Sequence, residues 1–245
     1  MTKKLLVQIK NEWRNNLWLA LELLVVSVVM WFVVDYLYTG AATYLEPRGF
    51  DISHCYLIEM GKLTEKSPDY LSSQTDEQED ADILELVDRL RRRPEIEAVS
   101  LSQNSYPYNG SNSTDQVRYD TLVADNWTIR RMVTPDFVRV FRYQAHVVKR
   151  PNSLRDAGKG EFLASNNLYR KYNRPMTELV GKQFQLFGDT TQTFRLGAAL
   201  KDVRYSDFQQ ARNSYTFLYK LGWYDPGLEL CLRVRANQDH DSSGA

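Results

Sequence analysis

Few residues in this 245-residue chain could do chemistry, and they are dispersed. The three histidines, His54, His146 and His240, form no His-x-x-x-His pair, and the two cysteines, Cys55 and Cys231, form no Cys-x-x-Cys motif. His54 and Cys55 are adjacent, but neighbouring residues of a strand point to opposite faces, which argues against a shared metal. The sequence also has no glycine-rich phosphate loop and no nucleophile elbow. We therefore expect no enzymatic activity, no metal and no cofactor.

The two cysteines lie in apolar, strand-like segments, HCYLIEM (54–60) and LELCLRV (228–234). Two interpretations stay open: a pair of buried thiols, and a disulfide between Cys55 and Cys231 in an oxidising compartment. Sequence spacing alone does not show that two Cα atoms come close enough to be bridged. We therefore favour two buried thiols over the disulfide.

The elements that position these residues begin with an apolar segment. Residues 17–38 read LWLALELLVVSVVMWFVVDYLY, in which only Glu22, Ser27 and Asp35 are neither apolar nor aromatic. As a helix with about 1.5 Å rise per residue the segment would extend roughly 33 Å, enough for a hydrocarbon core of about 30 Å. We predict a transmembrane helix over residues 17–38. Its candidate membrane-anchoring residues are aromatic residues near the interfaces and two acids: Trp18, Glu22, Trp31, Asp35, Tyr36 and Tyr38.

Basic residues set the predicted orientation of this helix. Lys3, Lys4, Lys10 and Arg14 precede it, whereas only Arg48 occurs in the twenty residues that follow. This bias predicts a cytoplasmic N-terminus and an extracytoplasmic bulk. A cleaved signal peptide is the alternative, because the small residues at 40–42 could form a cleavage site. Residues 1–16 are predicted to form a cytoplasmic amphipathic lead.

Within the span, Glu22 is predicted to face a partner helix or the cytoplasmic interface, because a carboxylate that faces lipid is costly.

Chain-wide averages conceal this organisation. The 31 Lys and Arg balance 31 Asp and Glu, and the mean hydropathy is −0.48. These values exclude a chain that is disordered throughout and a membrane protein with many spans. The zero net charge also argues against a nucleic-acid-binding protein, which needs a basic face to neutralise phosphates.

The extracytoplasmic part is predicted to mix strands and helices. Residues 76–93 have apolar side chains at spacings of three and four, with acids in the first turns and arginines in the last. This pattern predicts an amphipathic helix that ends before Pro94. Strands at 54–60 and 96–101 would flank it and complete a strand–helix–strand unit. Further strands are predicted at 117–124, 127–133, 161–164, 183–187, 193–200, 215–220 and 228–235.

Capping signals predict two shorter helices. Thr134 would be the N-cap and Pro135 the first residue of a helix that continues through DFVRVFRY (136–143). Ser165 and Asn166 would cap a second helix in the segment NNLYRKY (166–172). The last residues, 237–245, show no periodicity and are predicted to be a disordered tail.

The order of these segments resembles that of a known family. The apolar segment is followed by EPRGFDISHCYLIEMGKLTEKSPDY (46–70), VTPDFVRVFRY (133–143), EFLASNNLYRKY (161–172), LVGKQFQLFGDTTQTFRLGAALKDVRYSDF (179–208) and LELCLRVR (228–235). Together they resemble the N-terminal half of an ABC-transporter permease of the MacB/FtsX type. The likeness is particularly to the version common in Bacteroides-like bacteria, the Bacteroidetes.

The resemblance implies an α+β fold with a single N-terminal transmembrane helix and a periplasmic MacB-like core. A porter-like βαβ part with ferredoxin-like elements would occupy residues 39–102 and resume in a return strand at 226–236. A β-rich inserted subdomain would occupy residues 103–225. Members of the family continue with a second porter helix and strand and with three more spans, so one edge strand of this chain is expected to be unpaired. Lower stability, or oligomerisation through that edge, would follow.

The resemblance also implies a function and partners. Such a permease couples ATP hydrolysis by an ABC-type ATPase subunit to efflux or to transmembrane mechanotransmission, and has no nucleotide site of its own. The implied partners are that ATPase, a second permease copy or paralogue, membrane lipid and a periplasmic protein, but no nucleic acid, and the implied location is the bacterial inner membrane. An alternative from another class is a single-span, membrane-anchored sensor or ligand-binding ectodomain.

Overall fold

The fold is of the mixed α+β class that the sequence predicts, with one apolar N-terminal helix and one large mixed sheet. The structure, a computed structural model, describes residues 7, 13–60, 63–70, 75–110, 112–148, 161–218 and 228–236. It divides into two compact units, Met1–Glu46 and Pro47–Ala245. The predictions for Lys3, Lys4, Lys10 and for the tail at 237–245 concern residues outside those ranges.

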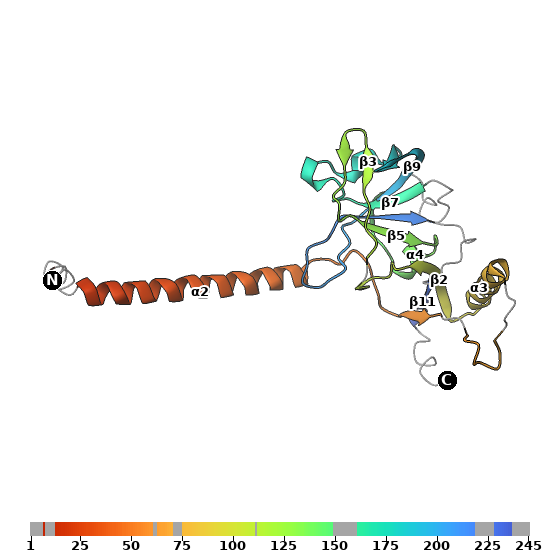
Figure 1. The fold of residues 1–245 in the computed structure, drawn as a ribbon, viewed down its shortest axis with the longest axis horizontal. Coiled ribbons are helices and arrows are strands. Elements are labelled where there is room, and N and C mark those ends of the chain that lie inside the picture. Colours follow the sequence, from red (N-terminus) through yellow and green to blue (C-terminus); the bar gives the residue numbers. More distant parts are fainter. Residues whose placement is uncertain are drawn as a thin grey trace. The chain divides into compact units, whose positions relative to one another are not determined.

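The first unit is built on one long helix, α2, at Trp13–Leu45 (Figure 1). The helix begins inside the predicted cytoplasmic lead and continues past the predicted end of the span at Tyr38, through the small residues at 40–42. Its segment Leu17–Leu45 is long and apolar enough, by length and composition, to cross a membrane. The 33 residues of α2 correspond to about 50 Å of helix, more than a hydrocarbon core of about 30 Å requires.

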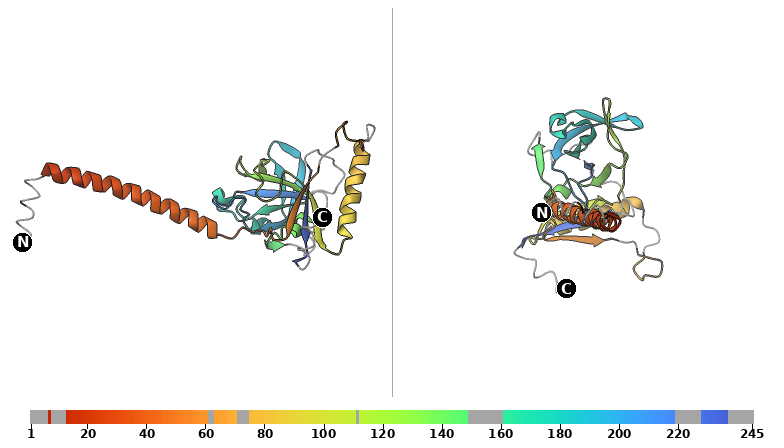
Figure 2. Two further views of the ribbon diagram at one scale, coloured as in Figure 1. Left: turned by 90° about the horizontal axis from the view of Figure 1, so that it is seen from below. Right: turned by 90° about the vertical axis from the view of Figure 1, so that its left-hand side faces the viewer.

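The second unit is organised around a sheet to which all the described strands belong. The strand order is β1-β11-β2-β5-β10-β7-β9-β8-β3-β4, and β6 pairs with β9. Several of these strands are labelled in Figure 1, and Figure 2 shows the same ribbon in two further views. The pairs β5/β10 and β7/β9 are parallel, and the other pairs in this order are antiparallel. The strands span Cys55–Glu59 (β1), Ile96–Gln103 (β2), Val117–Tyr119 (β3), Leu122–Val123 (β4), Ile129–Val133 (β5), Ala145–Val148 (β6), Glu161–Ser165 (β7), Gln183–Leu186 (β8), Asp189–Leu200 (β9), Ser214–Leu218 (β10) and Leu228–Val234 (β11).

One end of the sheet contains the predicted strand–helix–strand unit. Strands β1 and β2 both lie antiparallel to β11, which runs between them, and the helix α3 (Asp76–Arg91) connects β1 to β2. This is a split β-α-β arrangement, as in ferredoxin-like folds. A capping box between Thr75 and Gln78 begins α3, and acidic residues in its first turn complement the helix dipole. In the described part of the chain β1 pairs only with β11, and it is therefore an edge strand.

Buried apolar side chains form separate clusters along the sheet. One lies under α3 and includes Val87, Val99 and Leu230. A second gathers around the short helix α4 (Phe137–Val140) and includes Leu163 and Cys231. A third fills the β-rich end around Phe162, Phe184 and Tyr169, beside the 3₁₀ helix η2 (Met176–Leu179). The single sheet path passes through all three, and the division into a porter-like and an inserted part stays a prediction.

The prediction of one strand over residues 117–124 is wrong in detail. Strands β3 and β4 form a tight hairpin there, in which Tyr119 pairs with Leu122. Asp120, at the turn, has a φ of 53°. Aspartate tolerates this left-handed conformation better than most residues, and the chain can therefore reverse at this point.

The predicted N-cap at Thr134 is also wrong. Helix α4 follows Asp136, and no side chain caps it. The Thr134 hydroxyl instead accepts a hydrogen bond from the Leu101 N–H at 3.0 Å and lies 2.8 Å from the Ser100 hydroxyl. Thr134 thus binds the edge of β2, because a buried donor of the sheet competes for the oxygen that a cap would use.

The helix predicted after Ser165 is reduced to a 3₁₀ turn, η1, at Arg170–Tyr172. The Ser165 hydroxyl donates to the Asn167 side chain at 2.6 Å and accepts from the Ser214 N–H at 2.9 Å. The bond from Ser214 joins β7 to β10, and Ser165 is the last residue of a strand rather than a helix cap.

Candidate functional site

The candidate functional site is the segment that immediately follows α2. Residues 48–53, which we call the anchor segment, run along the second unit and lead into β1. Helix α2 ends at Leu45 and the second unit begins at Pro47, so the connection in the chain is very short. Residues 48–53 are therefore among the first residues of the second unit that follow α2 in the chain.

Three backbone hydrogen bonds join the anchor segment to other parts of the unit. The Arg204 N–H donates to the Arg48 carbonyl at 3.1 Å, and the Gln144 N–H donates to the Gly49 carbonyl at 3.2 Å. The Asp51 N–H donates to the Phe141 carbonyl at 2.8 Å. These bonds reach residues about 90 to 155 positions away in the sequence, and the segment is thus integrated into the tertiary structure.

Glycine is required at position 49 for two reasons. Gly49 has a φ of +80°, which side chains with a Cβ rarely adopt. A Cβ built there would lie 2.5 Å from the Asp202 carbonyl oxygen, a backbone atom that cannot move alone. The anchor segment therefore passes close against the Asp202 backbone.

Phe50 fixes the middle of the segment through its ring. The side chain is buried and lies against three tyrosine rings, with centroid distances of 5.7 Å to Tyr108, 6.2 Å to Tyr143 and 6.0 Å to Tyr205. Aromatic pairs at such distances add to the free energy that burial alone provides. The Tyr143 and Tyr205 hydroxyls are also hydrogen bonded to each other at 2.7 Å.

Arg48 adds an ion pair at the start of the segment. Its Nε lies 3.3 Å from Asp207 Oδ1, and that oxygen also accepts a hydrogen bond of 2.8 Å from the Tyr108 hydroxyl. Both partners are partly exposed, and the pair therefore contributes specificity more than stability.

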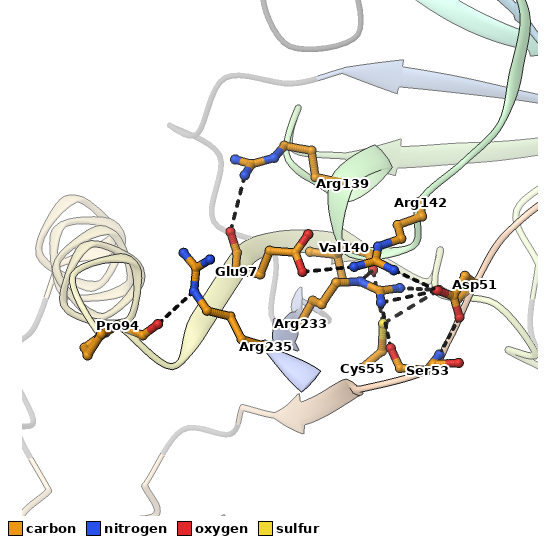
Figure 3. Close-up of polar contacts among 10 residues, drawn as sticks. All are labelled: Asp51, Ser53, Cys55, Pro94, Glu97, Arg139, Val140, Arg142, Arg233 and Arg235. Atoms are coloured by element: carbon orange, nitrogen blue, oxygen red, sulfur yellow. Dashed lines mark hydrogen bonds and ion pairs between the residues drawn. The ribbon is translucent and has the colours of Figure 1, made fainter. Parts of the chain in front are cut away.

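The end of the segment is held by Arg233, a residue of β11 that is 0% exposed (Figure 3). Its guanidinium donates to three carbonyl oxygens: Nη2 to Asp51 at 2.6 Å, Nη1 to Ser53 at 2.7 Å and Nε to Val140 at 2.6 Å. Nη1 also lies 3.4 Å from Asp51 Oδ2. One buried side chain thus connects the anchor segment, the C-terminal strand and α4.

Asp51 supplies the negative charge of this cluster. Its Oδ2 lies 3.4 Å from Arg142 Nη1, and its Oδ1 accepts from the Ser53 N–H at 2.8 Å. Burial by itself would raise the pKa of Asp51, but the hydrogen bonds from Ser53 and the charges of Arg233 and Arg142 outweigh it and keep the pKa below its usual value. The carboxylate therefore stays ionised beside the buried guanidinium.

Both cysteines are free thiols, contrary to the disulfide alternative. In the β1/β11 register Cys55 is opposite Arg233 and Cys231 is opposite Leu57, which places the two cysteines diagonally. Diagonal positions in a sheet are about 7–8 Å apart, too far for a disulfide unless the backbone moves. Burial raises the pKa of Cys55 to about 11 and that of Cys231 to about 12. The Cys55 thiol donates to the Val140 carbonyl at 3.1 Å, next to Arg233 (Figure 3).

The predicted membrane-anchoring residues all lie on α2. Trp18, Glu22, Trp31, Asp35, Tyr36 and Tyr38 are exposed along this helix. Of the topology-setting residues, Arg14 also lies on α2. Their roles at a membrane stay predictions.

No set of three or more His, Cys, Asp or Glu side chains in the described ranges converges to hold a metal ion. The site is a cluster of arginine, aspartate and aromatic side chains. Its arrangement fastens backbone segments to one another.

Comparison with known proteins gives fold likenesses at low sequence identity. No family model and no curated protein matches the chain. Three solved structures similar to it are a domain of a protein designated a permease in Porphyromonas gingivalis, the extracellular domain of the noncanonic ABC-type transporter YknZ from Gram-positive bacteria, and the periplasmic region of MacB from Actinobacillus actinomycetemcomitans. Their TM-scores are 0.45, 0.44 and 0.46, and their sequence identities are 15%, 13% and 11%.

The shared segments differ in extent. The likeness to the Porphyromonas gingivalis domain covers 61% of this chain and 66% of that one. For YknZ the values are 76% and 86%, and for MacB they are 81% and 85%. One of the three is the extracellular domain of an ABC-type transporter and one is a periplasmic region, and each likeness is one of fold.

The sequence interpretation missed the central residue of the site. Arg233 was part of a predicted strand in which Leu230, Leu232 and Val234 alternate with Glu229, Cys231 and Arg233. This alternation is typical of a strand with one face in solvent. A usable signal was Cys231 on the same face as Arg233, since free cysteine is among the most buried residue types.

Proposed function

We propose that the chain is the membrane-anchored periplasmic part of an ABC-transporter permease of the MacB/FtsX type, and that it transmits motion between its membrane helix and its periplasmic unit. The observation that carries the proposal is the anchor segment. It begins at Arg48, three residues after the end of α2 at Leu45, and is fastened at once by backbone bonds, by Phe50 and by Arg233. If the helix moved, the sheet would be displaced with it, because a connection this short would absorb little of the motion.

The resemblance in segment order supports the remaining parts of the proposal. An ABC-type ATPase subunit would hydrolyse ATP on the cytoplasmic side, and a second permease copy or paralogue would complete the membrane part. The location would be a bacterial inner membrane, with the N-terminus in the cytoplasm as the lysines and arginine before the span predict. The chain itself would do no chemistry, and Bacteroidetes are its proposed source.

The test uses the full chain, co-purified with its ATPase and placed in nanodiscs. A donor dye is attached at Thr121→Cys, an exposed position in the β3–β4 turn, and an acceptor is placed on lipid head groups. The native thiols should not compete for the dye, because the raised pKa values of Cys55 and Cys231 leave them protonated. We expect ATP to change the energy transfer.

A flexible nonapeptide of glycine and serine inserted between Glu46 and Pro47 should abolish that change while the ATPase still co-purifies. The same insertion between Gly188 and Asp189, in the β8–β9 turn, is the control and should leave the change intact. An unchanged ATP response after the first insertion would refute transmission through the anchor segment. If no ATPase co-purified with the chain, the sensor or ligand-binding alternative would replace the permease assignment.

A further inference from the structure

A polar cavity of about 270 Å³ lies in the second unit, away from the Asp51–Arg233 contacts. It is lined by the loop that follows β2 and by the loop between β9 and β10. Amide, hydroxyl and aromatic groups dominate, and no carboxylate is among the lining residues. Those used below are Tyr108, Asn112, Ile129, Tyr205 and Arg212.

A buried arginine lies behind the wall of this cavity. Arg131, on β5, is only 1% exposed. Its Nη2 donates to the Asn112 Oδ1 at 3.0 Å, and its Cζ lies 3.7 Å from the centroid of the Tyr205 ring. Nη1 donates to the Asn104 carbonyl at 3.4 Å, and Nε is buried without a hydrogen-bond partner.

The positive charge of Arg131 has no direct counter-charge in the described part of the chain. Its polar contacts are an amide oxygen and a carbonyl oxygen, both neutral. Glu229 interacts with Arg131 electrostatically, but its Oε2 accepts hydrogen bonds from Ser102 and Ser105 instead. A buried guanidinium without an ion pair is costly, and a nearby anion would lower that cost.

Arg131 also determines what Asn112 presents to the cavity. An amide has one acceptor oxygen and one donor nitrogen. Because the Asn112 oxygen is held by the guanidinium, its Nδ2 group is left as a donor. Arg212, which is exposed and forms no ion pair with the residues described, supplies a guanidinium to the lining itself. The cavity thus has one cation and amide donors in its lining, and the second cation, Arg131, lies behind the wall.

The walls of the cavity indicate what carries the anionic group. Ile129 and the tyrosine rings supply apolar surface, which an inorganic ion would not use. The volume, about 270 Å³, is slightly below the usual range for ligand cavities, about 300–1,000 Å³. A small organic acid, with a short carbon body and one carboxylate, matches both the charge and the size.

We propose that this cavity binds a small organic carboxylate, with Arg212 and the Asn112 Nδ2 group as direct partners of the carboxylate and Arg131 as a positioning residue behind them. The cavity shares Tyr108 and Tyr205 with the contacts of Phe50 in the anchor segment, but the proposal does not depend on the permease assignment.

The test compares matched probes on the full chain in phosphatidylcholine nanodiscs. Saturation-transfer difference NMR of the probe measures binding of N-acetylglycine and of N-acetylglycinamide, which has nearly the same shape but no charge. We expect N-acetylglycine to bind at least about tenfold more tightly, the effect of one charge-assisted contact. Equal binding of the two probes, or no saturation of N-acetylglycine up to about 20 mM, would overturn the proposal.

Two variants locate the binding. Arg212→Gln should weaken N-acetylglycine binding about tenfold. Arg93→Gln, which removes one exposed positive charge just after α3, should leave it unchanged. Equal effects of the two variants would show that net charge rather than the cavity attracts the probe, and the proposal would fail. Tighter binding of inorganic phosphate than of N-acetylglycine would overturn the choice of carboxylate.

Discussion

Two arginines, Arg233 and Arg131, are both buried in the same sheet, but their surroundings differ. Arg233 donates to three carbonyl oxygens and forms an ion pair with Asp51. Arg131 contacts two neutral oxygens and an aromatic ring, and its Nε has no hydrogen-bond partner. Every nitrogen of the first arginine has a hydrogen-bond partner in the protein, and this arginine fastens the anchor segment. The second leaves positive charge beside a cavity.

This comparison shows that the burial of a charged side chain does not by itself indicate what that side chain does. A buried guanidinium with an ion pair and several hydrogen bonds is costly to remove, because the partner groups are left without water or hydrogen bonds. A buried cation with neutral partners is costly while it is present, and its removal relieves that cost. The same substitution at the two positions should therefore have very different effects on stability.

The largest expected effect is that of Arg233→Met. The change leaves the carboxylate of Asp51 and three carbonyl groups without their donor, and we expect the free energy of unfolding to fall by about 3–5 kcal/mol. Arg131→Met, the matched variant, should lower it by less than about 1 kcal/mol. Urea unfolding of the full chain in nanodiscs, followed by circular dichroism, measures both. An equal loss in the free energy of unfolding for the two variants would contradict the difference proposed between the two arginines.

A smaller loss is expected from Gly49→Ala in the anchor segment. The new Cβ would meet the Asp202 carbonyl oxygen in an unfavourable backbone conformation, at a cost of about 2–4 kcal/mol. Gly110→Ala, in the cavity lining, should cost less than about 1 kcal/mol, since nothing lies within 4 Å of the added atom. The same urea titration compares them.

Gly188→Ala separates the two causes of the Gly49 effect. Gly188 has a φ of +93° but open space around it, and the variant therefore reports conformational strain alone. If Gly188→Ala cost as much as Gly49→Ala, close packing of the anchor segment against Asp202 would not be the reason.

The smallest expected effect is the contribution of Asp51 to the pH dependence of stability. The folded-state pKa of Asp51 is lowered, so its contribution to stability is present above its unfolded value near 3.8 and is lost as the pH falls through the folded pKa. The side chain is 36% exposed, and solvent screening keeps this contribution below about 1 kcal/mol. Asp51→Asn should therefore reduce the loss of stability below about pH 4, seen in urea titrations at several pH values. An unchanged acid profile would contradict the assignment.

The sequence predicted most elements because local signals were sufficient for them. Helix α3 has regular apolar spacing, an acidic first turn and Pro94 after its end, and the structure confirms it. Alternating apolar and polar residues, bounded by turn residues, also predicted strands β1, β2, β7, β8 and β11. The long apolar helix α2 followed from composition, although its end at Leu45 did not.

The rest depended on contacts between distant segments. Thr134 has the local pattern of a cap, but the buried N–H of Leu101 competes for its hydroxyl. Arg233 alternates with apolar residues as surface residues do, yet β11 is buried on both faces from Leu230 to Val234. Arg131 lies on the same face of β5 as the buried residues Ile129 and Val133. The cavity has no sequence motif, because its two loops are about one hundred residues apart.

The two thiols have a further consequence for a protein placed in an oxidising compartment. Cys55 and Cys231, with pKa values of about 11 and 12, are almost entirely protonated at neutral pH and are poor nucleophiles in the folded unit. Alkylation or oxidation is therefore expected to be slow in the folded unit and faster whenever local opening exposes the thiols to water. The rate of thiol modification would then report how often the strands around the two cysteines open.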